Sequence, residues 1–209
     1  MENKIMLREF FKEDAPAIWD IIREAWHYDE FCSPKTARKM ARVFLSSCLA
    51  NQTYTQVALS GGRPVGIIMA KNCRTHKCSP GSRLALVKSA LALYCSKEGR
   101  RVAKMFSGVD DIDRQLLQSC SKNYPGEIAF FAVSAAARKK GIGKLLFQSA
   151  LDYMKSQHIE EFYLFTDTSC NYGFYEHQGM ERRCAKSHSF IIKNYNVKMD
   201  FFVYDYTFD

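Results

Sequence analysis

The hydrophobic pattern of the first seventy residues alternates between that of strands and that of helices. Residues 5–10 alternate apolar and polar positions, as a half-buried strand does. Two stretches with apolar residues at helical spacing follow, and each has a proline just inside its start. A Ser60-Gly61-Gly62 turn then joins two apolar runs, which indicates a β-hairpin. The predicted elements are a strand over 5–10, helices beginning near Pro16 and Pro34, and strands over 53–59 and 64–70.

The second half of the chain begins with a long helical stretch that separates two strands. Residues 127–133 form a strand that is apolar on both faces, as a central strand of a sheet should be. We therefore predict an α/β fold in which helices flank a mixed central sheet, with a helical insertion at about 72–125 between strands 3 and 4. The remaining predicted elements are a helix from 142, a strand over 161–167, a short helix over 171–178, and strands over 180–192 and 197–206.

Length and composition fit a soluble globular protein. With 209 residues, 47% of them hydrophobic, the chain suits a single domain over 1–209. Its longest apolar run, residues 128–133, is far shorter than the roughly twenty residues that a membrane span needs. The first residues lack the apolar segment of a signal peptide, so we expect a cytoplasmic protein without membrane partners.

The net charge of +8 comes from one stretch of the chain. Between Lys71 and Lys104 there are nine basic residues and a single acidic one, Glu98, while the rest of the chain is neutral. Basic clusters attract phosphates, nucleic acid or acidic surfaces. A solvated helical face that keeps the protein soluble explains the pattern equally well, and both interpretations stay open.

The eight cysteines are scattered singly along the chain. A secreted disulfide framework would come with a signal peptide and a shorter chain, so we expect reduced thiols. Cys73, His76 and Cys78 lie close together, but their spacing matches no zinc motif. We predict no metal site.

The segment most typical of a functional site runs from Val133 to Lys144. A strand ends there, a glycine-containing basic turn follows, and a helix begins. The free N–H groups at a helix start, with glycines that allow close approach, suit a pyrophosphate. The pattern is neither a P-loop nor the full dinucleotide fingerprint. A helix start with glycines for packing is the alternative interpretation.

Two motifs in this half of the chain resemble those of the GNAT superfamily of N-acetyltransferases. Arg138-Lys139-Lys140-Gly141-Ile142-Gly143 is similar to the acetyl-coenzyme A signature R/Q-x-x-G-x-G/A, directly after a central strand. Phe174-Tyr175-Glu176-His177-Gln178-Gly179-Met180 resembles the family's F-Y-E-K-x-G-F segment, with Asn171 at the usual upstream asparagine. Ala135 stands where many members have proline, and the insertion at 72–125 departs from the minimal pattern.

The resemblance implies acetyl-coenzyme A as cosubstrate. Its pyrophosphate would lie on the turn before the second half's long helix, and its pantetheine arm would pair with the end of the central strand, which must separate from its neighbour. Asn171 would bind the cofactor arm, or alternatively cap the following helix. The cofactor contacts implied are Phe131, Ala132, Val133, Arg138, Lys139, Lys140, Gly141, Ile142, Gly143, Lys144 and Asn171.

The implied reaction is direct attack of a primary amine on the thioester in a ternary complex. Glu127 is the candidate base, because burial at the start of an apolar strand would make its carboxylate a stronger base. Tyr175 matches the family tyrosine that acts as general acid. Asp29 and Glu30 are weaker candidates, as substitute bases or as contacts for a cationic substrate. The alternatives are a solvated Glu127 and a Tyr175 that only packs beneath the pantetheine.

The acceptor is a small-molecule amine or a peptide or protein amine, and the sequence does not distinguish them. A different function class also stays open: a catalytically silent coenzyme A-binding module that acts through its basic insertion on nucleic acid or an acidic partner. The insertion has no helix-turn-helix signature and no regular aromatic interleaving, which disfavours nucleic acid. A homodimer is compatible with the sequence.

Overall fold

The computed structural model describes residues 4–192 and 195–208. Seven strands form one mixed sheet in the order β1-β2-β3-β4-β5-β7-β6, in which β4 and β5 are parallel and the other described neighbours are antiparallel. This confirms the predicted fold class. The elements are β1 (Ile5–Arg8), the 3-10 turn η1 (Lys12–Asp14), α1 (Ala15–Ala25), α2 (Tyr28–Phe31), α3 (Pro34–Ala50), β2 (Tyr54–Ser60), β3 (Arg63–Asn72), α4 (Pro80–Tyr94), α5 (Lys97–Phe106), α6 (Val109–Ser119), β4 (Gly126–Val133), the 3-10 turn η2 (Ala135–Ala137), α7 (Ile142–Ser156), β5 (Glu161–Asp167), α8 (Gly173–His177), β6 (Glu181–Ile192) and β7 (Tyr195–Thr207).

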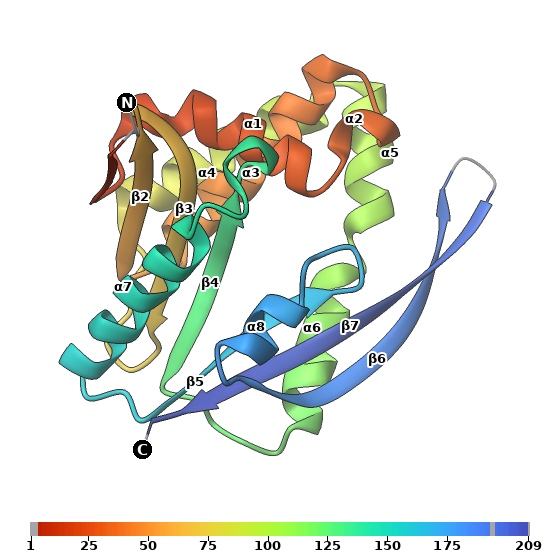
Figure 1. Ribbon diagram of the computed structural model, residues 1–209. Coiled ribbons are helices and arrows are strands. Elements are labelled where there is room, and N and C mark those ends of the chain that lie inside the picture. The colour runs from red at the N-terminus through yellow and green to blue at the C-terminus, as the bar shows by residue number, and fades with distance from the viewer. Residues whose placement is uncertain (1–3, 193–194, 209) are drawn as a thin grey trace.

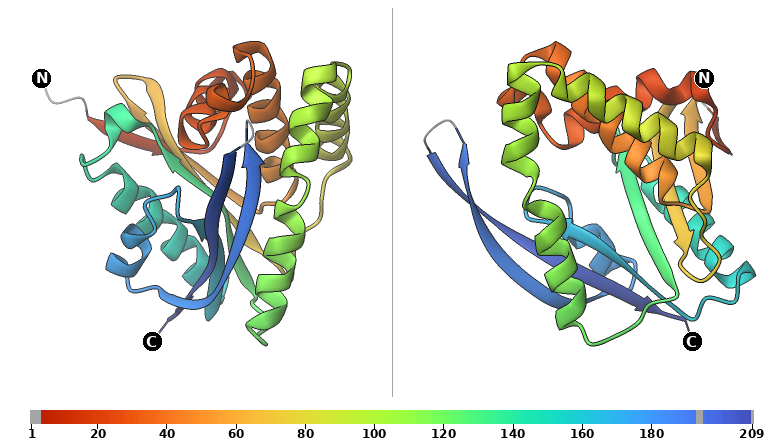
Figure 2. Two further views of the ribbon diagram at one scale, coloured as in Figure 1. Left: turned by 90° about the vertical axis from the view of Figure 1, so that its right-hand side faces the viewer. Right: turned by 180° about the vertical axis from the view of Figure 1, so that it is seen from behind.

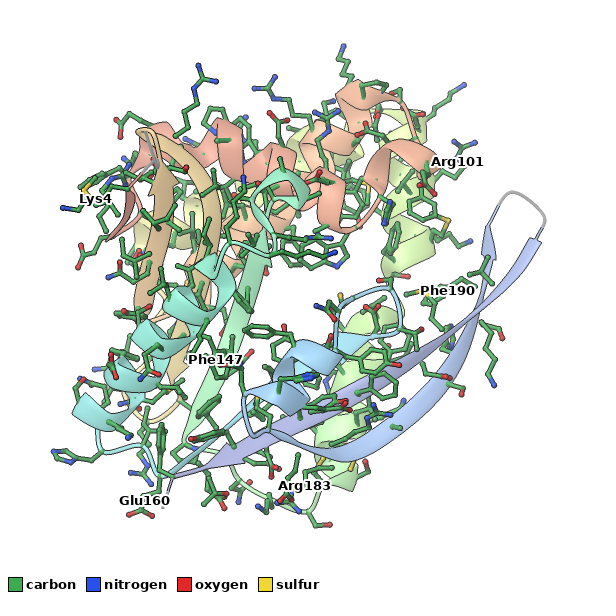
Figure 3. The ribbon with its side chains drawn as sticks, viewed as in Figure 1. Lys4, Arg101, Phe147, Glu160, Arg183 and Phe190 are labelled. Atoms are coloured by element: carbon green, nitrogen blue, oxygen red, sulfur yellow. The ribbon has the colours of Figure 1, made fainter. Side chains whose placement is uncertain are left out.

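Helices cover both faces of the sheet. Helices α7 and α8 lie on one face, while α1 and α3 cover the other (Figure 1). The core under α7 centres on Phe147, whose ring lies 6.4 Å from Phe131 of β4, 6.4 Å from Phe162 of β5 and 5.8 Å from Phe174 (Figure 3). Phe147 is fully buried. One aromatic side chain of α7 thus packs against β4, β5 and α8.

The first strand ends two residues earlier than predicted, and an ion pair explains why. The Arg8 guanidinium donates two hydrogen bonds of 2.7 Å to the Asp14 carboxylate, and the Phe11 amide donates a third of 2.8 Å. These bonds turn the chain between β1 and α1, and they hold the pKa of Asp14 below its ordinary value. Asp14 occupies the predicted N-cap position of α1, but its side chain makes no cap hydrogen bond.

The insertion consists of three helices that extend across one side of the molecule. Helix α4 packs on the outside of α3, α5 contacts α3 and α4, and α6 packs on β6 and β7 (Figure 2). Glu98 fixes α5 to the start of α3, because its carboxylate accepts hydrogen bonds from the Ser33 amide, the Ser33 hydroxyl and the Thr36 hydroxyl. None of the helices within residues 4–192 and 195–208 is long and apolar enough to cross a membrane.

Gly126 is where β4 begins beside β5, and it has no room for a side chain. A Cβ at this position would lie 2.8 Å from both Ile159 Cγ2 and Phe162 Cβ, and 3.1 Å from Met154 Sδ. We predict that Gly126→Ala lowers the free energy of unfolding by about 1–3 kcal/mol, because the added methyl overpacks the core. Urea denaturation measures this change.

The matched control is Gly81→Ala in the first turn of α4, where the nearest atom would be Ser79 Oγ at 3.9 Å. Alanine is the better helix former, so this variant should be at least as stable as the parent. Equal stability losses in the two variants would contradict the packing argument.

Candidate functional site

Strands β4 and β5 are paired only where they begin. Gly126 and Glu127 pair with Phe162 and Tyr163, and no later pair between the two strands occurs among the described residues. The end of β4, Phe131 to Val133, stays paired on its other edge with residues 66–68 of β3. Figure 1 shows β4 and β5 diverging from the end where they are paired. One backbone edge of Phe131, Ala132 and Val133 therefore faces the space between the strands, as an incoming extended chain would require.

The turn before α7 presents backbone amides and basic side chains together. Gly141, the N-cap of α7, has a φ of 77°, a left-handed conformation that favours glycine. The first backbone hydrogen bond into the helix is Leu145 N to Gly141 O, so the amides of Ile142, Gly143 and Lys144 precede the helical ladder. The ammonium or guanidinium side chains of Arg138, Lys139, Lys140 and Lys144 belong to exposed residues.

Two further bonds fix this turn to the end of the central strand. Arg138 Nε donates to the Val133 carbonyl at 3.2 Å, and Lys140 Nζ donates to the Ala136 carbonyl at 2.9 Å. Gly143 lies against Phe131 and Phe174: a Cβ there would be 3.4 Å from Phe174 Cε2. A larger side chain at residue 143 would press on both rings, so a glycine here keeps α7 close to β4.

Tyr175 of α8 lies on the same face of the sheet, beside the end of β4. Its ring centroid is 6.3 Å from that of Phe131 and 5.6 Å from that of Phe174. Burial raises the pKa of the Tyr175 phenol above its ordinary value, and the nearby Cys170 and Asp167 raise it further. The phenol is therefore protonated at neutral pH, which is the form that a general acid needs.

Asn171 is exposed and lies in the loop before α8. The alternative in which its side chain caps this helix is wrong, since Tyr172 occupies the N-cap and the helix starts two residues later than predicted. The Asn171 carbonyl accepts from the Phe174 amide at 3.1 Å, so the backbone rather than the side chain closes the turn. Binding of the cofactor arm by the Asn171 side chain stays a prediction.

Glu127 is buried on the opposite face of the sheet, beneath the insertion. The Glu127 carboxylate lies 3.4 Å from Lys71 Nζ, and the residue is 8% exposed. Tyr163, its partner across the β4–β5 pair, has its pKa raised by burial and then by the charge of Glu127. Glu127 and Tyr175 thus lie on two faces of the sheet.

The structure adds a carboxyl that sequence reasoning missed. Asp113 of α6 has its pKa raised to about 7, first by burial and then by the charges of Asp110, Asp167 and Glu127. The charges of carboxyls on β4 and β5 therefore act on Asp113 of α6. The signal available in the sequence was the spacing of Asp110 and Asp113, three residues apart on one helix face.

Asp29 and Glu30 lie on α2 and have partners of their own. Arg23 donates to both carboxylate oxygens of Asp29, at 2.9 and 3.0 Å. Glu30 faces His27 Nδ1 at 3.2 Å and is well exposed. Among the described residues, no hydrogen bond or ion pair joins Asp29 or Glu30 to Glu127 or Tyr175. Their role as substrate contacts stays a prediction.

The described residues contain no group of three or more His, Cys, Asp or Glu side chains arranged to hold a metal ion. All eight cysteines are free thiols.

Asp113 makes stability depend on pH in a defined direction. Its pKa is about 7 in the folded chain and about 4 when unfolded, so folding strengthens proton binding. The resulting stabilisation is complete below about pH 4 and is lost as the pH rises through 7. We predict that Asp113→Asn, which cannot ionise, raises the melting temperature at pH 8 and reduces its fall between pH 5 and 8.

Thermal unfolding followed by circular dichroism measures both temperatures. Asp111→Asn is the control, because Asp111 is exposed on the same helix and ion-paired with Arg114. If the two variants respond to pH alike, Asp113 does not bind its proton as described.

Solved structures of N-acetyltransferases share this fold over nearly the whole chain. An N-acetyltransferase from Staphylococcus aureus Mu50 superposes with a TM-score of 0.55 at 15% identity, covering 98% of each chain. A GCN5-related N-acetyltransferase from Kribbella flavida gives 0.56 at 16% identity, also over 98% of each. The ribosomal-protein-S18-alanine N-acetyltransferase from Escherichia coli gives 0.56 at 9% identity, over 98% of this chain and 94% of that one.

At these identities the structural likeness establishes the fold alone. No curated protein is similar enough in sequence to count as a match. The family model for the acetyltransferase (GNAT) family, in contrast, matches residues 15–180, which include the turn before α7 and the α8 segment. The chain therefore belongs to the GNAT acetyltransferase family, whose members carry out acyl transfer.

Proposed function

We propose that this protein is an N-acetyltransferase that moves the acetyl group of acetyl-coenzyme A to a primary amine by direct attack. The observation that carries the proposal is the divergence of β4 and β5. It places an unpaired backbone edge of β4 beside the amide-rich basic turn of α7 on one face, and buried carboxyls on the other.

The residues around the α7 turn fit coenzyme A. The amides of residues 142–144 and the basic side chains before them suit a pyrophosphate. The edge of Phe131, Ala132 and Val133 that does not pair with β5 suits the amide groups of a pantetheine arm, which can pair as a strand does; its Val133 carbonyl accepts from Arg138 Nε. When bound, acetyl-coenzyme A supplies an activated acetyl group on sulfur.

In the proposed reaction, the Glu127 carboxylate acts on the acceptor amine. A primary ammonium has a pKa near 10, so it must lose a proton before its nitrogen can attack. Glu127 accepts that proton, and its carboxylate lies 3.4 Å from Lys71 Nζ. Asp113 adds negative potential on the same face, which attracts a cationic acceptor.

Tyr175 completes the proton balance. The amine nitrogen forms a bond to the acetyl carbon, and the carbon–sulfur bond breaks with its electron pair staying on sulfur. The nitrogen gives its second proton to solvent, the Tyr175 phenol gives the thiolate a proton, and the resulting phenolate regains a proton from solvent, so that the products are an amide and a free thiol. The protonated state of Tyr175 follows from its burial between Phe131 and Phe174.

The proposal is tested by supplying acetyl-coenzyme A with a panel of polyamines, aminoglycosides, amino acids and peptides. We expect release of free thiol together with an acetylated amine identified by mass spectrometry. Absence of turnover across the panel, with coenzyme A bound, would favour the catalytically silent module instead.

We predict that Tyr175→Phe lowers kcat by about 10²–10⁴-fold, because the phenol proton is lost while the ring remains. The dissociation constant of coenzyme A, measured by calorimetry, should be unchanged. Tyr172→Phe is the matched control: it removes a hydroxyl next to the same helix, packs on Phe202, and should leave kcat as it was. A Tyr175→Phe variant with full kcat would remove Tyr175 from the mechanism.

We also predict that Glu127→Gln lowers kcat/KM for the amine by about 10²–10⁴-fold, since the amide cannot accept the proton. The matched control is Glu160→Gln, because Glu160 is exposed at a corner of the molecule (Figure 3). Initial rates at pH 7 and pH 9 distinguish the roles: if Glu127 is the base, raising the pH restores part of the lost rate. Equal losses at both pH values would mean that Glu127 is structural.

A further inference from the structure

Helix α4 is apolar on two opposite sides. Ser89 and Leu93 are buried against the protein, while four large apolar residues face solvent. At about 100° per residue, these four fall within a sector of about 80° on the side opposite Ser89. They make up half of the large apolar residues that are exposed in the described chain. We call this set the α4 stripe: Leu84, Val87, Leu91 and Tyr94, which are 53%, 48%, 61% and 51% exposed.

The rim of the α4 stripe is basic. Arg83 and Lys88 are exposed on its two sides, and Arg100 reaches the carbonyl of Tyr94 at its end, at 2.7 Å. Other exposed cations of the insertion follow on α5, among them Arg101, which points outward in Figure 3. The one acidic residue between Lys71 and Lys104 is Glu98, and its hydrogen bonds to Ser33 and Thr36 lower its pKa to about 2.

A shallow hollow lies at the start of the α4 stripe. Its volume is about 370 Å³, and its lining residues are Cys78, Pro80, Arg83, Leu84 and Val87. The lining combines apolar atoms with one guanidinium. A hollow of this kind accepts a protruding apolar side chain with a carboxylate nearby.

We propose that the α4 stripe is the docking surface for an amphipathic helix of an acidic partner protein. A contiguous apolar stripe on a helix needs a partner that covers it. The uncompensated basic rim selects a partner with Asp and Glu beside its own apolar residues. This inference is independent of the acyl-transfer chemistry, because α4 lies outside α3 rather than at the β4–β5 opening.

Other occupants fit these observations less well. A second copy of this chain would bring an identical basic rim against the first, and like charges would repel. Nucleic acid would match the rim but leave the four apolar side chains uncovered. A flat anionic membrane surface would leave the hollow between Pro80 and Val87 unfilled.

The test uses a fluorescein-labelled 18-residue peptide, designed as a helix with leucines in one stripe and glutamates on both sides. We expect the full chain to bind it, by fluorescence anisotropy, with a dissociation constant well below about 1 mM. Rising salt should weaken binding, because salt screens the attraction between opposite charges that are exposed to water. A peptide with lysines in place of the glutamates should not bind.

Variants locate the binding on α4. Leu84→Gln combined with Leu91→Gln should weaken binding at least about tenfold, because both leucines lose apolar contact. Arg83→Glu combined with Lys88→Glu should weaken it similarly and remove the salt dependence. Met6→Gln, an equally exposed position on β1, is the control and should bind normally.

The same experiment includes three other ligands: anionic vesicles, duplex DNA and a second copy of the chain. Binding to phosphatidylserine vesicles or to duplex DNA, without binding to the acidic peptide, would overturn the proposal. So would a dimer, seen by sedimentation, that the leucine variant dissociates. Absence of peptide binding would overturn it as well, whatever the enzymatic activity of the chain.

Discussion

The rest of the structure depends on the short parallel pair between β4 and β5. Two residues of each strand, Gly126 and Glu127 with Phe162 and Tyr163, join the β1–β4 part of the sheet to the β5–β7–β6 part. The pair forms because residue 126 has no side chain to collide with Ile159, Phe162 and Met154. Beyond it, Phe147 and its aromatic neighbours fill the core under α7 while the strands diverge. The closed end thus fixes where the open end lies.

Charge is distributed in two layers that a net value of +8 hides. The outer surface of α4 and α5 is basic, and the single acid between Lys71 and Lys104 is bonded to α3. Beneath α6, in contrast, the charges of Asp167 and Glu127 help to raise the pKa of Asp113. A basic exterior and an acidic interior suit different partners. The same insertion thus has basic side chains on α4 and α5 and, on α6, a carboxyl whose pKa is raised by neighbouring carboxylates.

Much of this fold could be predicted because the decisive patterns are local. A strand apolar on both faces predicted β4, and the glycine-containing turn after it predicted the start of α7. The features that escaped prediction are non-local. The charge of Glu127 acts on Asp113 because of where α6 packs on the sheet, and β1 stops at Arg8 because of an ion pair with Asp14. Asn171 satisfied a local capping rule, yet α8 begins at Gly173 with Tyr172 before it.

The path of the insertion has a mechanical consequence. Helices α4 and α5 belong to the N-terminal half of the sheet through α3, and α6 belongs to the C-terminal half through β6 and β7. The short joint at Ser107 and Gly108 connects them. Any widening of the angle between the two halves must therefore bend this joint as well as the β4–β5 pair. The short connection between α5 and α6, although it is remote from β4 and β5, therefore limits how far the two strands can separate.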